Sequence, residues 1–229
     1  MKKTAKTALL LVMLISLISC TAADILGTTS SAGTSETQQN STLTSGQVPD
    51  PVLPMRGSSE DGVYESGSLG IGIEFDSEWT LFNDTRLASL NGITEDAFKE
   101  NYTEIIKTND LVYDMYAMRS DGSTMNIYFE NMDLMYGSAM SESDYIDASV
   151  SQMETTFAQM NWAVESSEKL TVNAAEQEFS AFKLSVNIGT GYLYETVMCK
   201  KIGGHMAVIN IASVSIDVID GIIADFYKL

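Results

Sequence analysis

The chain has 229 residues, of which 31 are acidic and 13 are Lys or Arg, and its formal net charge at pH 7 is −18. An acidic excess of this size excludes electrostatic binding to nucleic acid or to anionic lipid. Hydrophobic residues make up 45% of the chain, which is enough to build a folded domain.

The first twenty residues resemble the start of a bacterial lipoprotein. Three lysines at positions 2, 3 and 6 precede an apolar run over residues 8–18, which is too short to span a bilayer stably. The run ends in Leu-Ile-Ser-Cys at positions 17–20, similar to the lipobox that lipoprotein signal peptidase recognises. This resemblance implies that residues 1–19 are a signal peptide and that Cys20 becomes lipidated. We therefore expect a secreted protein, lipid-anchored at the extracytoplasmic face of the cell membrane.

A change in composition predicts two further regions. Residues 20–62 are rich in Ser and Thr, contain all three prolines and lack a sustained apolar period, so we expect a flexible tether. Residues 63–229 contain every tyrosine, phenylalanine and tryptophan, and their number fits a single domain. The core is therefore expected in this second region.

Three segments of the domain have a helical pattern. Thr94 precedes two acidic residues and is expected to cap a helix, with apolar residues at positions 98, 102, 105 and 106. Ser141 and Asp144 resemble a capping box at the start of a helix with an apolar stripe over positions 146–160. A C-terminal helix is also expected, with Ile219, Ile222, Ile223 and Phe226 on one apolar face.

Two hairpins predict an antiparallel sheet. Asp121-Gly122 separates the alternating segments 112–118 and 124–130, and Gly203-Gly204 separates 191–201 from 205–212. Together with the helices, this pattern predicts an α+β fold with a single antiparallel β-sheet packed by helices.

The start of the domain resembles a known superfamily. Residues 64–75, Tyr-Glu-Ser-Gly-Ser-Leu-Gly-Ile-Gly-Ile-Glu-Phe, followed by Trp79, look like the opening of PsbP-like domains, which include Mog-like and DcrB-like proteins. The order of the elements over 63–229 is also similar, although Asp76 stands where the family commonly has proline. The resemblance implies an α/β/α sandwich. It carries over no catalytic residue, because the members of this superfamily share none.

The residue types that usually carry catalysis are sparse. The one histidine, His205, flanks the Gly-Gly turn and is expected to be exposed there. After lipidation of Cys20, Cys199 is the remaining thiol, and its place in an alternating strand predicts a buried apolar role. A Cys199–His205 nucleophilic pair has no third residue to orient it. We therefore expect no catalytic residue, no metal site and no cofactor.

Tyrosines on the predicted strands are the candidate binding residues. Tyr128 shares a predicted face with Asn126, and Tyr192 and Tyr194 share one with Thr196, a mixture typical of recognition surfaces. The sequence thus favours a non-enzymatic binding or accessory module, which contacts the membrane through its lipid and recognises an unknown protein or small ligand. The alternatives are an assembly factor for a membrane complex and a small hydrolase that uses acidic residues.

Overall fold

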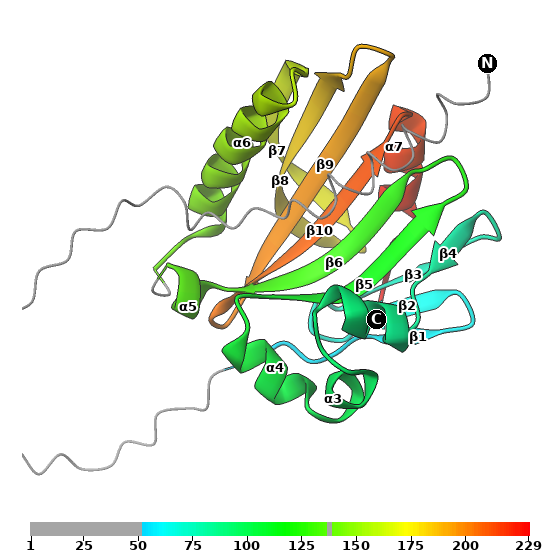
Figure 1. The fold of residues 1–229 in the computed structure, drawn as a ribbon, viewed down its shortest axis with the longest axis vertical. Helices are drawn as coiled ribbons and strands as arrows, with labels where there is room; N and C mark the ends of the chain where they lie inside the picture. Colours follow the sequence, from blue (N-terminus) through cyan, green and yellow to red (C-terminus); the bar gives the residue numbers. More distant parts are fainter. Residues whose placement is uncertain (1–51, 137–138) are drawn as a thin grey trace, which may run out of the picture.

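The computed structural model describes residues 52–136 and 139–229, which form an α+β fold (Figure 1). The prediction of this fold class is confirmed, but the prediction of a single sheet is wrong, because the strands form two antiparallel sheets. The small sheet has the strand order β1 (Ser58–Glu60), β2 (Val63–Ser66), β3 (Ile71–Glu74), β11 (Tyr227–Lys228). The large sheet has the order β4 (Trp79–Leu81), β5 (Leu111–Arg119), β6 (Thr124–Asn131), β10 (His205–Ser213), β9 (Tyr192–Ile202), β8 (Gln177–Asn187), β7 (Ala163–Ala174).

The small sheet was not predicted, because its strands have only two to four residues. Such short segments cannot show the alternation of apolar and polar residues that indicates a strand. Its outer strands also come from distant parts of the chain, since β11 follows β3 in space and lies at the C-terminal end of the sequence. The ring of Tyr227 in β11 lies against Gly72 of β3, where a Cβ atom would collide with it. Glycine at position 72 therefore allows the C-terminal strand to close this sheet.

The part of the chain that the structure describes begins before residue 63, where the composition placed the start of the domain. β1 lies inside the segment 20–62 that was expected to be a tether, and it pairs with β2. Next to it, the backbone N–H of Gly57 donates to the carboxylate of Asp114. Cys20 and the predicted signal peptide lie outside the described residues. Within residues 52–136 and 139–229, no helix is long and apolar enough to cross a membrane.

Six helices accompany the sheets in the part of the chain that the structure describes. They are α2 (Asp84–Leu90), α3 (Glu95–Glu100), α4 (Tyr102–Thr108), α5 (Met132–Met135), α6 (Glu142–Gln159) and α7 (Ile216–Asp225). Thr94 caps α3, and Ser141 forms the predicted capping box with Asp144 at the start of α6. The segment after Thr94 forms two helices instead of one, because Asn101 leaves the helical conformation with φ −121° and ψ 23°.

Both predicted hairpins are confirmed. β5 and β6 pair around the Asp121-Gly122 turn, and β9 and β10 pair around Gly203-Gly204. β7 was not predicted, because five of its first seven residues are exposed and polar and the segment shows no alternation. It nevertheless pairs with β8 along its length.

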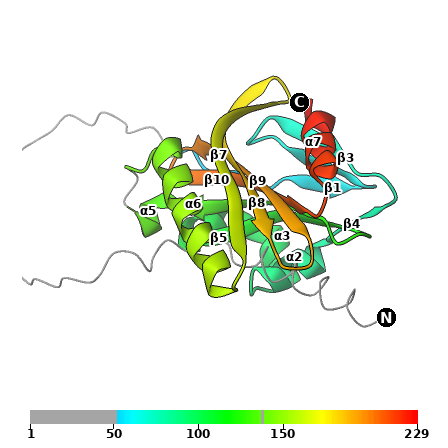
Figure 2. The ribbon, with the colours of Figure 1, turned by 90° about the horizontal axis from the view of Figure 1, so that it is seen from above.

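The two faces of the large sheet are covered differently (Figure 2). Tyr128, Val208 and Cys199 are cross-strand partners on β6, β10 and β9, so they point to one face. Cys199 Sγ lies 3.9 Å from the carbonyl oxygen of Glu142 in α6, and we call this the α6 face. Residues of opposite parity form the α7 face, where Lys183 of β8 pairs with Asp220 of α7 at 3.1 Å.

Candidate functional site

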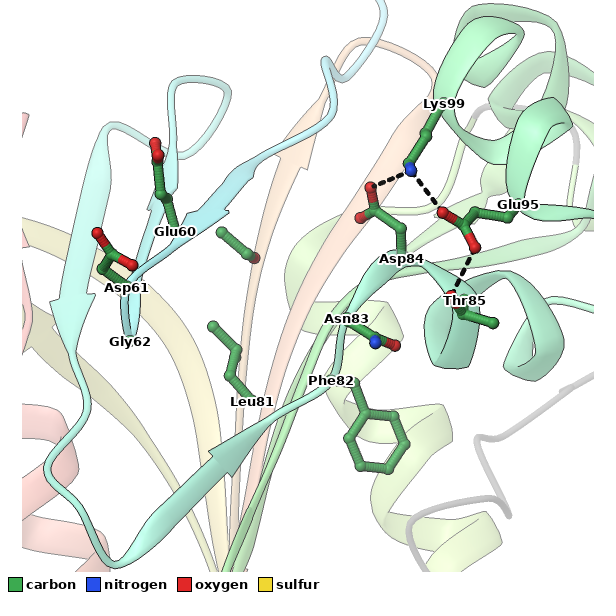
Figure 3. A pocket seen from close by; sticks show the side chains of 11 residues that line it. Glu60, Asp61, Gly62, Leu81, Phe82, Asn83, Asp84, Thr85, Glu95 and Lys99 are labelled. Atoms are coloured by element: carbon green, nitrogen blue, oxygen red, sulfur yellow. Dashed lines mark hydrogen bonds and ion pairs between the residues drawn. The ribbon is translucent and has the colours of Figure 1, made fainter.

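A cleft of about 370 Å³ lies between the β1–β2 turn, the end of β4 and helices α2 and α3 (Figure 3). Inside it, Lys99 Nζ lies 3.7 Å from the carboxylate of Asp84 and 2.5 Å from that of Glu95. Glu95 also accepts a hydrogen bond of 2.5 Å from the hydroxyl of Thr85. The cation and hydroxyl of the protein itself thus satisfy these two carboxylates, which do not require a ligand.

The three candidate tyrosines do not form one surface. Tyr128 is buried on the α6 face, and its ring lies 5.5 Å from that of Tyr113. Tyr192 and Tyr194 alternate with Glu195 on β9 and therefore point to the α7 face, where their rings stack at 6.3 Å. Tyr192 is 45% exposed. Of the three, Tyr128 is therefore part of the core, and the Tyr192–Tyr194 pair lies on the opposite face of the sheet.

Cys199 and His205 cannot form a nucleophilic pair, because they point to opposite faces of the sheet. Cys199 pairs with Val208, and the odd-numbered His205 of β10 points to the other face. The prediction of an exposed His205 is wrong: the side chain is buried, with Nε2 2.9 Å from the carbonyl oxygen of Ile106 in α4. Cys199 is buried as expected, and burial raises the pKa of its thiol.

A buried polar row crosses the middle of the α6 face. We use the name polar row for Asn126 of β6, Asn210 of β10 and Glu195 of β9. Asn126 and Asn210 are direct cross-strand partners, and Glu195 pairs with the residue two positions beyond Asn210. All three side chains are buried, with exposures of 0%, 8% and 1%. They bring three neighbouring strands to one place.

The hydrogen bonds of the polar row are incomplete. The side chains of Glu195 and Asn210 share one hydrogen bond. Within the described residues, four atoms have no partner: Nδ2 and Oδ1 of Asn126, Oδ1 of Asn210 and Oε2 of Glu195. Buried polar atoms are nearly always hydrogen-bonded in native proteins, and leaving one unpaired costs about 1–3 kcal/mol. The described residues therefore supply no hydrogen-bond partner for these four atoms.

Aromatic side chains flank the row on the same face. Tyr116 of β5 is the cross-strand partner of Asn126, and Tyr128 lies two residues along β6. The ring of Tyr116 lies 4.7 Å from that of Phe82, which follows β4. Helix α6 packs on β7, β8 and β9, and α2 packs on β5.

Glu195 is the ionisable member of the row. Its burial raises the pKa of the carboxyl group from 4.5 to about 7, and the hydrogen bond to Asn210 opposes this rise. Among the described residues, Glu195 takes part in no ion pair. A carboxylate buried without a cation is unfavourable, so this group is set to bind a proton or a positive charge.

A second buried carboxyl group on the α6 face belongs to Glu130, at the far end of β6. Burial raises its pKa from 4.5 to about 8, and a hydrogen bond from Tyr145 of α6 opposes the rise. Glu130 pairs with Met206 of β10 whereas Glu195 pairs with Ala212, six residues away. At about 3.4 Å per residue the two carboxyl groups are about 20 Å apart along the strand.

Sequence reasoning identified one member of the polar row, since Asn126 was noted on the face of Tyr128. Asn210 and Glu195 were missed. The available signal was that each lies in phase with apolar residues of its own strand, with Val208 two positions before Asn210 and Val197 two positions after Glu195. A polar residue in phase with an apolar strand face indicates a buried polar group.

The residues that the structure describes contain no group of three or more His, Cys, Asp or Glu side chains placed to hold a metal ion. No family model matches the chain, and a search of curated proteins finds no match. Among solved structures, the chain is similar to a crystal structure of a protein from Bacteroides thetaiotaomicron, with 11% sequence identity and a TM-score of 0.36. The similarity covers 73% of this chain and 48% of the other, so the chain spans about half the length of the protein it matches.

Proposed function

We propose that this domain is a non-enzymatic binding module whose ligand contacts the polar row on the α6 face. The observation that carries the proposal is the set of four unpartnered buried atoms on Asn126, Asn210 and Glu195. A bound ligand would supply the hydrogen bonds that the protein lacks there. Polar groups kept at a cost in stability are characteristic of functional sites.

The proposal includes the place where the module works. The lipobox-like sequence around Cys20 supports a lipid anchor at the extracytoplasmic face of the cell membrane. The PsbP-like α/β/α architecture belongs to the same proposal. Helices on both faces of the large sheet support it, and the small sheet is an addition on the α7 face.

The separation of the buried carboxyl groups of Glu130 and Glu195 argues against a hydrolase that uses them as a catalytic pair. Paired carboxylates in glycosidases lie about 5–10 Å apart, whereas the strand register separates Glu130 and Glu195 by about 20 Å. These two groups are therefore too distant to act on one bond. The role of an assembly factor stays a prediction.

A comparison of two asparagines tests whether the polar row is functional or structural. Asn131 is also buried in β6, but its Nδ2 donates to the carbonyl oxygens of Ile106 and Lys107, and its Oδ1 accepts from the N–H of Leu134. We expect Asn126→Leu to keep or raise the free energy of unfolding by about 1–3 kcal/mol, because it removes unpaired polar atoms. Asn131→Leu should lower it by about 2–4 kcal/mol, because three hydrogen bonds are lost.

Urea unfolding of the full-length chain, followed by circular dichroism, measures both variants. If Asn126→Leu destabilises the protein as much as Asn131→Leu does, the polar row holds the fold together and the proposal is wrong. If Asn126→Leu is neutral or stabilising, the side chain is not needed for folding, as a binding role requires.

A further inference from the structure

The free atoms of the polar row are mostly hydrogen-bond acceptors. Oδ1 of Asn126, Oδ1 of Asn210 and Oε2 of Glu195 can each accept, whereas Nδ2 of Asn126 is the one unpartnered donor of the row among the described residues. The hydrogen bond to Glu195 involves Asn210 Nδ2, because Asn210 Oδ1 has no partner among the described residues. A complementary ligand must therefore bring several N–H or O–H donors.

The buried carboxyl group of Glu195 favours a positively charged ligand. The carboxyl group of Glu195 is buried without a cation among the described residues, and a ligand cation would supply the missing charge. Hydrogen bonds between a cation and a carboxylate are roughly twice as strong as neutral ones. The net charge of −18 also favours the approach of cations and disfavours that of anions.

The tyrosines next to the polar row also favour a cationic ligand. Tyr116 lies beside Asn126 across the strand pair, and Tyr128 lies two residues along the same strand. Tyrosine rings attract cations at their faces and also bury apolar carbon. An organic cation, with a charged head and an alkyl body, uses both properties.

We propose, on the basis of the proposed function, that the polar row binds an organic cation through an ammonium or guanidinium group. The charged group donates hydrogen bonds to Glu195 Oε2 and Asn210 Oδ1. A second donor of the ligand reaches Asn126 Oδ1, and the alkyl part lies near Tyr116 and Tyr128. Agmatine, which carries a guanidinium and an ammonium group joined by an alkyl chain, is a suitable probe.

Isothermal titration of the full-length chain with agmatine tests this proposal. Because exposed carboxylates also attract cations, the titration is run in 1 M sodium chloride, where the Debye length is about 3 Å and surface attraction is screened. Maltose, which brings many O–H donors and no charge, is titrated in parallel. We expect saturable binding of agmatine at one site and no binding of maltose.

Two variants with the same change of charge locate the site. Glu195→Gln removes the buried carboxylate, and we expect it to weaken agmatine binding by about tenfold or more. Glu178→Gln is the matched control, because Glu178 is exposed on β8 of the same sheet, and binding should not change. Asn126→Leu gives an independent variant of the row and should also weaken binding.

The outcomes distinguish a failure of the organic-cation proposal from a failure of the proposed binding function. Agmatine binding that is equal in Glu195→Gln and the wild type overturns the proposal, as does the absence of agmatine binding. Binding of maltose alone, lost in Asn126→Leu, also overturns the cation proposal but leaves the proposed function in place. The proposed function is tested separately, because the free energies of unfolding of Asn126→Leu and Asn131→Leu are compared without any ligand.

Discussion

Asp114 is the connection between the two sheets whose loss should be most damaging. The register of β5 and β6 shifts between Tyr113 and Met115, so Asp114 is the extra residue of a β-bulge, which re-aims its side chain. Its carboxylate accepts a hydrogen bond of 2.5 Å from the hydroxyl of Tyr64 in β2. It also accepts one of 2.9 Å from the N–H of Gly57. One buried side chain thus joins β5 to the small sheet and to the segment before β1.

The loss of stability on replacing Asp114 can be estimated from the hydrogen-bond donors that would lose their acceptor. In Asp114→Ala, the hydroxyl of Tyr64 and the N–H of Gly57 lose their acceptor, and each unpaired buried donor costs about 1–3 kcal/mol. Burial raises the pKa of Asp114, which shows that its own desolvation offsets part of this gain. We therefore expect a loss of about 3 kcal/mol. For a domain of this size, that lowers Tm by about 6–12 °C.

The measurement is thermal and urea unfolding of the full-length chain, with Asp110→Ala as the control. Asp110 is exposed immediately before β5, so its replacement should change stability by less than about 0.5 kcal/mol. Asp114→Asn keeps one acceptor oxygen and should fall between the two. A value for Asp114→Ala equal to that of Asp110→Ala would show that the connection does not stabilise the fold.

Two further predictions concern Glu130 and Cys20. Burial raises the pKa of Glu130 from 4.5 to about 8, so the folded state holds this proton more tightly, and its contribution to stability is lost as pH rises from about 4.5 to about 8. Between pH 5 and pH 8, the free energy of unfolding of Glu130→Gln should fall less than that of the wild type. The difference should reach up to about 1.4 kcal/mol per pH unit between the two pKa values. An identical fall in both proteins would contradict this assignment. Cys20→Ala should abolish retention of the protein in the membrane fraction, and normal retention would refute the proposed anchor.

The sequence predicted best those elements that carry a local signal. The capping residues Thr94 and Ser141 and the turn at Gly203-Gly204 act over a few residues, and each appears where it was expected. The small sheet depends on contacts between β3 and β11, separated by most of the chain, and short strands leave no periodic trace. Sequence reasoning therefore found the hairpins of the large sheet and missed the second sheet altogether.

The candidate site shows the same division between local and distant information. Period-two alternation correctly placed Tyr128 with Asn126, but only the register of three strands brings Asn210 and Glu195 to the same place. A shift of one residue between β9 and β10 would turn Glu195 to the α7 face and dissolve the row. The site is therefore a property of strand pairing. Val208, the partner of Cys199, and Val197, the partner of Asn210, are buried on the same face as the row, so burial of the core favours the register that holds the polar row in position.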